Sequence, residues 1–158
     1  MPRRSAGLVV FREAAHGPEV LLVHPGGPFW ARRDEGAWSI PKGEVAEGED
    51  ALQAARREFE EETGAAAPGG PVFALAPCRQ KGGKIVEAWA IAGELDPSTL
   101  RSNTFALEWP PRSGRHVQVP EVDRAAWFPL DEARRRILEG QRPLIDELEA
   151  RLRPDRPR

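Results

Sequence analysis

The chain has 158 residues, which is the usual size of one folded domain, so we predict a single domain over residues 1–158 with its core at about residues 5–152. Hydrophobic residues make up 40% of the chain and charged residues 30%, a balance that excludes a disordered chain and a bundle of membrane helices. The net charge of −2 lacks the strong positive field typical of proteins that bind nucleic-acid polymers. We therefore expect neither a nucleic-acid polymer nor a membrane as a partner.

Cysteine and histidine are scarce. Cys78 is the only cysteine, which excludes an internal disulfide and a cysteine-rich zinc site. The three histidines are far apart in the sequence and do not support a zinc site or a histidine phosphatase. The apolar run at residues 6–11 ends at Arg12 and is too short for a signal peptide, and no segment approaches the ~20 apolar residues of a membrane span. These features predict a cytoplasmic protein.

The first third of the chain alternates apolar runs with turns. β-Branched and large apolar residues predict short strands at residues 6–11, 19–24 and 38–40. Residues 14–18 carry turn formers between the first two strands. Residues 25–36 contain three glycines and two prolines around Phe29 and Trp30. This composition predicts a loop that presents aromatic surface.

One helix is predicted with particular clarity, at residues 50–63. This segment has no proline or glycine, and Leu52, Ala55 and Phe59 recur at helical spacing. Gly64 follows it and is typical of a residue that ends a helix.

The rest of the chain predicts further strands and two more helices. Strands are expected at residues 72–77, 84–91, 104–109 and 125–128, and helices at 130–138 and 143–152. The Gly-Gly turn at residues 79–83 predicts that the first two of these strands pair as a hairpin. Residues 110–114 are rich in breakers and predict a loop, and the tail at 153–158 is expected to fray. Strands on both sides of one helix, with two helices at the end, predict an α+β fold, an α/β/α sandwich with a mixed sheet between helices.

Acidic residues cluster on the predicted helix. Glu58, Glu61 and Glu62 lie at positions i, i+3 and i+4, so their carboxylates project from one side of the helix and repel one another. A shared hard divalent cation makes such a cluster favourable, and magnesium is the natural candidate. Arg57 is adjacent and can pair with Glu49 just ahead of the helix. A bare acidic run is more often a solvated helix face, and only its context decides between the two interpretations.

The residues around this acidic run follow a fixed spacing. Five residues separate Gly43 from Glu49, seven more precede Arg57, and the chain then continues Glu-Phe-Glu-Glu-Glu-Thr-Gly-Ala to Ala65. This pattern resembles the Nudix box, and its seven fixed identities make it very specific. Only Ala65 departs from the pattern, because it is smaller than the bulky residue usual at that position.

The resemblance to the Nudix family implies the Nudix fold and a set of roles. Glu58, Glu61 and Glu62 match the metal-binding glutamates, the Gly43 carbonyl matches a frequent extra ligand, and Arg57 with Glu49 matches an orienting ion pair. The implied activity is Mg²⁺-dependent hydrolysis of a pyrophosphate link in a nucleoside-diphosphate compound, with Mn²⁺ as a substitute. The proton acceptor varies within the family, so Glu61, Glu62 and a loop glutamate all stay open.

Family members often add a ligand or base from a loop beyond the box. Glu121 is the first candidate because it lies in a proline-marked segment six residues before Trp127, as in the nucleotide-sanitising members. Glu108 is the second candidate. Either residue taken alone is more often a surface carboxylate.

Three further segments resemble the asymmetrical diadenosine tetraphosphatase branch of the family. They are residues 6–12, 19–23 and 38–43. This resemblance implies cleavage of a dinucleoside tetraphosphate into a nucleoside triphosphate and a monophosphate. We expect the protein to be a monomer or a homodimer. Tyrosines commonly stack the adenine in that branch, whereas this chain has none.

Other side chains must then hold the substrate. Phe29 and Trp30 are the first candidates for stacking on a base, with Trp89 and Trp109 behind them, since any flat aromatic face can stack. Lys42 beside the box is the best candidate to bind phosphate oxygens. The basic turn offers weaker ones, which are Arg79, Lys81 and Lys84.

Three alternatives stay open at this point. One is hydrolysis of oxidised nucleoside triphosphates, and another is cleavage of nucleotide sugars or inositol pyrophosphates. A third, from a different class, is a non-catalytic Nudix-like module that only binds a ligand. Such modules typically lose acids of the box, whereas this chain retains all of them.

Overall fold

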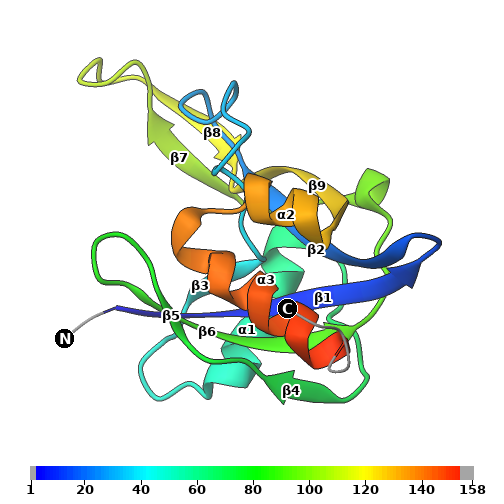
Figure 1. Ribbon diagram of the computed structural model, residues 1–158. Helices are drawn as coiled ribbons and strands as arrows, with labels where there is room; N and C mark the ends of the chain where they lie inside the picture. The colour runs from blue at the N-terminus through cyan, green and yellow to red at the C-terminus, as the bar shows by residue number, and fades with distance from the viewer. Residues whose placement is uncertain (1–2, 154–158) are drawn as a thin grey trace.

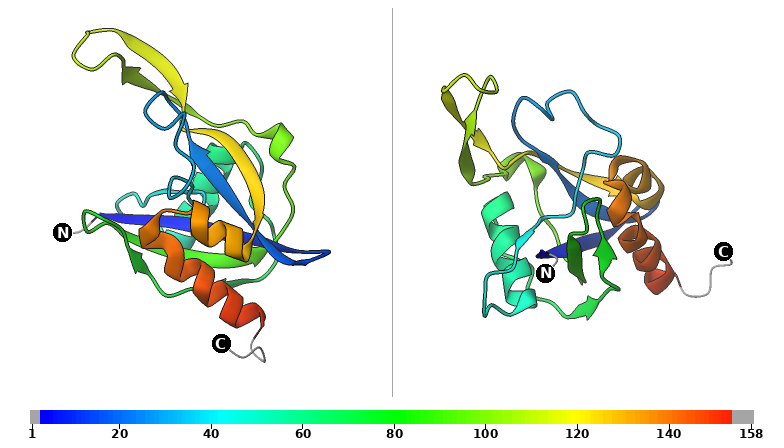
Figure 2. Two further views of the ribbon diagram at one scale, coloured as in Figure 1. Left: turned by 45° about the horizontal axis from the view of Figure 1, so that its top comes forward. Right: turned by 90° about the vertical axis from the view of Figure 1, so that its left-hand side faces the viewer.

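A mixed sheet lies between one helix on one face and two helices on the other, as Figures 1 and 2 show for the computed structural model, which describes residues 3–153. The predicted α+β sandwich is confirmed. The main sheet contains β1 (Arg4–Ala14), β2 (Gly17–Pro25), β3 (Lys42–Glu44), β4 (Val72–Ala74), β5 (Cys78–Arg79), β6 (Ile85–Ala92) and β9 (Val122–Pro129). The helices are α1 (Ala51–Thr63), α2 (Leu130–Arg136) and α3 (Arg142–Leu152), with short 3-10 turns η1 (Pro97–Thr99) and η2 (Glu139–Gln141).

Strand β1 is the centre of the sheet. The strand order is β4-β6-β1-β2-β9, with β1 and β6 parallel and the other neighbours antiparallel. β2 pairs with β1 only from Phe11 onward, whereas β3 pairs with the start of β1 at residues 5–7. Strands β1 and β2 therefore diverge, and the segment at residues 38–41 enters the opening. There the Leu8 N–H donates to the Pro41 carbonyl, with 3.2 Å between nitrogen and oxygen.

The predicted strand at residues 38–40 is wrong in its position. Trp38 and Ser39 make only isolated bridges, to Ile137 and Val23 respectively, and the continuous ladder begins at Lys42. Pro41 explains the shift, because it has no N–H to donate to a ladder at that point.

Both faces of the sheet are covered by apolar side chains, in agreement with the alternation of residues along β1. Ala6, Leu8 and Val10 pack toward α1, in a core that includes Phe59. Val9 points to the opposite face, which packs against α2 and α3. The second core is lined by leucines and isoleucines of these helices, including Leu144, Ile145 and Leu148. Each helix thus buries one apolar stripe.

Helix α1 has the ends that its sequence predicts. The Asp50 side chain accepts a hydrogen bond from the Gln53 N–H, which satisfies one free donor of the first turn. Gly64 follows in the left-handed conformation with φ of 77°, which a glycine adopts without strain. These two ends fix which residues of the box are helical.

Several other boundaries differ from the prediction. The predicted strand at residues 72–77 is shorter, since β4 ends at Ala74, and pairing with β6 resumes only after Pro77, which cannot donate to a ladder, in β5. Both β4 and β5 pair with β6, as the predicted hairpin requires. The strand at 125–128 is longer and becomes β9. The helix at 130–138 ends at Arg136. The tail beyond residue 153, predicted to fray, lies outside the described residues.

A second, two-stranded sheet projects from the main body, as both figures show. It consists of β7 (Thr104–Glu108) and β8 (His116–Pro120), and we call residues 104–120 the arm. The predicted strand at 104–109 is confirmed as β7. β8 was not predicted, because residues 110–114 before it are rich in breakers and no strand was expected directly after that loop. No helix among residues 3–153 is long and apolar enough to cross a membrane.

His24 fixes the loop that follows β2. It is fully buried, and its two ring nitrogens face the Asp123 carboxylate at 2.8 Å and the Arg33 carbonyl at 2.6 Å. We expect His24→Leu to lower the free energy of unfolding by about 1–3 kcal/mol, because both acceptors lose their partner while the volume changes little. Urea denaturation measures this. An unchanged midpoint would show that the two contacts do not stabilise the loop.

Candidate functional site

Three carboxylates converge where α1 meets the base of the arm. Glu58, Glu62 and Glu121 each offer one oxygen, and these oxygens lie within 4.8 Å of one another. Glu58 and Glu62 come from one side of α1, while Glu121 comes from the junction of β8 and β9. Oxygen ligands at this spacing suit a hard divalent cation.

The burial of these groups supports the same interpretation. The pKa of Glu62 is raised to about 8, mainly by burial, although the Lys42 N–H donates to its carboxylate at 3.2 Å. Burial also raises the pKa of Glu58 and of Glu121, and repulsion from Glu61 adds to both. The fold therefore gathers carboxyl groups in a partly desolvated place that disfavours their charged form, and a bound cation would stabilise that form.

Gly43 makes room for the cluster. A Cβ added at this position would lie 2.0 Å from the carboxyl carbon of Glu58, so only glycine lets the β3 backbone approach this close. The glycine of the box is therefore required by packing, independently of whether its carbonyl binds a metal.

We expect Gly43→Ala to damage the site and the fold together. The methyl group would push the Glu58 carboxylate aside, and overpacking of this kind costs about 1–3 kcal/mol. The expected results are a lower melting temperature and loss of hydrolytic turnover. A variant with wild-type turnover would contradict the tight packing seen here.

Arg57 holds several carboxylates in fixed positions. Its Nε and Nη2 donate to the two oxygens of Glu49, at 2.9 and 3.0 Å, in the bidentate pair that the sequence predicts. Its Nη1 donates to Glu58 at 2.9 Å and to Glu61 at 3.2 Å. The pair lowers the pKa of Glu49 to about 2, and the Ala46 N–H contributes further. Arg57 thereby fixes the position of the Glu58 carboxylate within the cluster.

Glu61 is placed differently from the other box glutamates. Both of its oxygens accept from Arg57 at 3.2 Å, and it does not belong to the close group of three. Its backbone carbonyl accepts from the Asn103 N–H at 2.9 Å, which ties α1 to the base of the arm. Glu61 thus borders the cluster.

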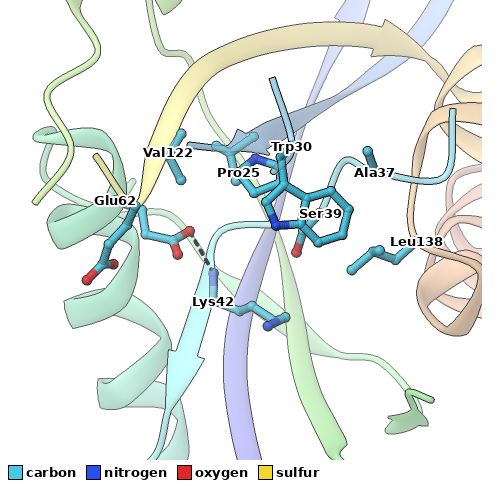
Figure 3. Close-up of a pocket in the computed structure, with 10 residues that line it drawn as sticks. Pro25, Trp30, Ala37, Ser39, Lys42, Glu62, Val122 and Leu138 are labelled. Atoms are coloured by element: carbon cyan, nitrogen blue, oxygen red, sulfur yellow. Dashed lines mark hydrogen bonds between the residues drawn. The ribbon is translucent and has the colours of Figure 1, made fainter. Parts of the chain in front are cut away.

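A cavity of about 170 Å³ opens beside the cluster. Glu62 and Glu121 line its acidic end, and Lys42 and Trp30 line the rest of it, as Figure 3 shows for the labelled side chains. Small and apolar residues complete the wall, namely Val23, Pro25, Ala37, Ser39, Val122 and Leu138. Sequence reasoning missed these wall residues, because small apolar side chains carry no chemical signal until the fold brings them together.

Lys42 is the cation of this cavity. Its side chain is partly buried, and its pKa is lowered by burial and by repulsion from Lys84. Among residues 3–153, no carboxylate forms an ion pair with its ammonium group. Lys84, the weaker candidate, lies close enough to Lys42 to repel it but does not line the cavity.

The aromatic and acidic candidates separate into two groups. Trp30 lines the cavity. Phe29 does not line it but packs edge-on against the Trp30 ring, with 5.1 Å between ring centroids, and its side chain is 57% exposed. Trp109 lies at the far end of the arm, away from the cavity. Glu108 also lies at that end, where it accepts from the Arg112 N–H at 3.0 Å. The suggestion that Glu108 joins the metal site is therefore wrong, because the whole length of β7 separates it from α1.

Comparison with known proteins places this architecture in a family. The NUDIX domain family matches residues 1–148 of the chain. Among solved structures, the NUDIX domain of Shewanella oneidensis NrtR, in complex with ADP ribose, has a TM-score of 0.65 and 19% identity, over 96% of this chain and 89% of that one. A C. elegans Ap4A hydrolase in a binary complex has a TM-score of 0.62 and 24% identity, over 95% and 97% of the two chains. At these identities the likeness shows the fold.

Curated relatives are more similar in sequence but longer. An octanoyltransferase of Myxococcus xanthus is 31% identical over 140 residues, which are 86% of this chain and 33% of that protein. An 8-oxo-(d)GTP phosphatase of Mycolicibacterium smegmatis is 31% identical over 143 residues, which are 82% of this chain and 36% of that protein. An RNA pyrophosphohydrolase of Caulobacter vibrioides is 50% identical over 56 residues, which are 31% of this chain and 33% of that protein.

Each of these matches covers about a third of the length of the curated relative. The match of the family over residues 1–148 agrees with the spacing from Gly43 to Gly64 and with the sheet between helices. The chain belongs to the NUDIX domain family.

Proposed function

We propose that this chain is a Mg²⁺-dependent pyrophosphohydrolase that cleaves diadenosine tetraphosphate into ATP and AMP. The observation that carries the proposal is the cavity between Trp30, Lys42 and the carboxylates Glu62 and Glu121. It combines a flat aromatic face for a base, a cation for phosphate oxygens and an acidic cluster for metal. These are the three elements that the chemistry requires.

The cavity takes one part of such a substrate. Its volume of about 170 Å³ is below the roughly 300–1,000 Å³ of pockets that enclose a whole drug-sized ligand. One base stacking on Trp30 would fill it, while the phosphates extend across Lys42 toward Glu58, Glu62 and Glu121. Among the described residues the Lys42 ammonium group forms no ion pair with a carboxylate, so it can pair with the polyphosphate.

The proposed reaction is attack of water on one phosphorus of the chain. A P–O–P bond breaks, the water oxygen stays on one product, and its protons leave toward a carboxylate and the solvent. Divalent cations held by Glu58, Glu62 and Glu121, with Glu61 beside them, would neutralise the phosphates and acidify the attacking water. Glu61, Glu62 and Glu121 are the candidates to accept the proton. Arg57 and Glu49 would keep Glu58 in place.

A substrate panel with Mg²⁺ tests the proposal. The panel contains diadenosine tetraphosphate, an oxidised deoxynucleoside triphosphate, a nucleotide sugar and an inositol pyrophosphate, with products separated by chromatography. Rapid release of ATP plus AMP from diadenosine tetraphosphate is the expected result. If this compound is untouched while a triphosphate yields pyrophosphate, the substrate assignment is wrong.

The second candidate is hydrolysis of oxidised nucleoside triphosphates. It is favoured by the similarity to the M. smegmatis 8-oxo-(d)GTP phosphatase over 82% of the chain. A non-catalytic ligand-binding module is a third candidate, and an absence of turnover on every substrate would favour it. For the native context we propose the cytoplasm, consistent with the buried free thiol of Cys78, and a monomer or homodimer without a nucleic-acid polymer as partner.

A further inference from the structure

The exposed apolar side chains are concentrated in one region. Among the described residues, the large hydrophobic side chains that are more than a third exposed are Phe29, Phe105, Trp109 and Val117. Three of them belong to the arm, and Phe29 belongs to the loop that packs against the base of the arm. Exposed apolar surface gathered in one place marks a binding surface more often than scattered residues do.

Three of these side chains share one face of the arm. Phe105 pairs with Val119 and Leu107 pairs with Val117 in the register of β7 and β8, so these four residues point to the same side. Trp109 continues the alternation at the end of β7. This face turns toward the loop, because a Cβ placed at Gly27 would lie 3.8 Å from both Leu107 and Val119. Leu107 and Val119 are thus used for packing, and the others remain exposed.

The arm starts at the metal-binding cluster. The Asn103 N–H donates to the Glu61 carbonyl at 2.9 Å, and the Glu121 N–H donates to the Asn103 carbonyl at 2.8 Å. The Gly26 N–H donates to the Glu121 carbonyl at 3.0 Å, which joins the loop to the same point. The five residues of β7 rise about 17 Å, so the exposed face extends from the acidic cluster outward by that length.

Arginines without acidic partners lie at the tip of the arm and in the loop beside its base. Among residues 3–153, no carboxylate forms an ion pair with Arg33, Arg112 or Arg115. Arg33 lies over the Phe29 ring at 4.5 Å from its centroid. The arginines of α2 are different, since Arg134, Arg135 and Arg136 all pair with carboxylates.

We infer that the arm binds the second nucleoside of a two-base substrate, with Phe105 as the stacking surface and the unpaired arginines as partners for phosphate or ribose oxygens. This inference rests on the proposed function, because it assigns the part of the substrate that the cavity leaves outside. Flat aromatic faces beside guanidinium groups are the chemistry that holds a base and its phosphate.

Two other occupants fit the charges less well. Residues 101–120 contain three arginines and a single glutamate, so two arms facing each other in a symmetric dimer would bring like charges together. A long nucleic acid strand would need a longer row of cations than these. The second nucleoside of a small substrate requires only what the arm offers.

Binding measurements separate this inference from the proposed function. Calorimetry with Ca²⁺ in place of Mg²⁺ gives the affinities for diadenosine tetraphosphate, which has two bases, and for adenosine 5′-tetraphosphate, which has one. We expect the wild type to prefer the two-base compound by about tenfold, since one stacked base contributes roughly that factor or more. Phe105→Leu should abolish this preference, and Phe105→Trp should retain it.

The control is Gln118→Ala, an exposed residue on the opposite face of the arm, which should keep the preference. A preference that survives in Phe105→Leu overturns the inference. The inference is also overturned if Phe105→Leu changes the molecular mass measured by sedimentation, which would indicate a dimer contact. It is overturned as well if Phe105→Leu weakens the binding of a 5′-triphosphorylated RNA oligonucleotide more than the binding of the dinucleotide. Failure of the Mg²⁺ substrate panel with the two-base preference intact would instead refute only the proposed cleavage.

Discussion

Glu58→Gln is expected to lower kcat/KM about a thousandfold or more without unfolding the protein. The substitution keeps the shape of the side chain and removes one of the negative charges that converge with Glu62 and Glu121. Metal ions contribute several kcal/mol to a hydrolytic transition state, and each ~1.4 kcal/mol is a factor of ten. Stability should be preserved, because the pKa of Glu58 is raised by burial and by repulsion from Glu61, both of which oppose a charge at this position.

The matched control for this experiment is Glu60→Gln. Glu60 lies on the same helix and within the same run of glutamates, but it is exposed and is not part of the close carboxylate group. The turnover of Glu60→Gln should equal that of the wild type. Steady-state kinetics and thermal melts of both variants test the prediction. Equal activity of Glu58→Gln and Glu60→Gln would show that the reaction does not depend on the cluster.

In the presence of a chelator, the protein is expected to lose stability as the pH rises from about 4.5 to about 8. The pKa of Glu62 is about 8 in the folded protein, against an ordinary value of 4.5. Between these values the folded state holds a proton that the unfolded state has released, so rising pH favours unfolding by up to about 1.4 kcal/mol per pH unit. The decline should level off above pH 8.

Mg²⁺ should reverse this loss. A cation bound to the ionised cluster stabilises the folded state, and the rise in melting temperature should be larger at pH 8 than at pH 5. About 1 kcal/mol corresponds to roughly 2–4 °C for a chain of this size. Glu49 does not affect the change of stability between pH 4.5 and pH 8. Its pKa is lowered to about 2, so its contribution to the free energy of unfolding is lost only as the pH falls below 4.5.

Melting curves over this pH range, with chelator and with Mg²⁺, provide the measurement. Glu62→Gln is the informative variant, since it removes a group whose pKa is raised to about 8 and should make the profile recorded in chelator shallower, while Glu58 and Glu121, whose pKa values are also raised, remain. A wild-type profile that rises between pH 5 and pH 8 would contradict the assigned burial of Glu62. A flat profile would do so as well.

Short-range patterns in the sequence were sufficient to predict helix α1 and the glutamates on it. The helical spacing of Leu52, Ala55 and Phe59, with Gly64 after them, predicted the helix. The pair of Arg57 with Glu49 could be predicted because the two residues are close in sequence. Helical periodicity and capping act over a few residues, so a pattern in the sequence is enough to reveal them. The first strand and the last helix were predicted from short segments in the same way.

Contacts between distant segments were decided only by the tertiary structure. Glu121 was a candidate among several, and it reaches Glu58 and Glu62 because β9 pairs with β2 and the base of the arm is hydrogen-bonded to α1. The cavity wall, the partner of Glu62 and the arm arise in the same way, from segments that no short-range pattern connects. Sheet register and loop packing depend on which strands pair, and burial of the whole core decides that pairing. The sequence by itself therefore determined which glutamates lie together on the helix, and the tertiary structure determined which residues surround them.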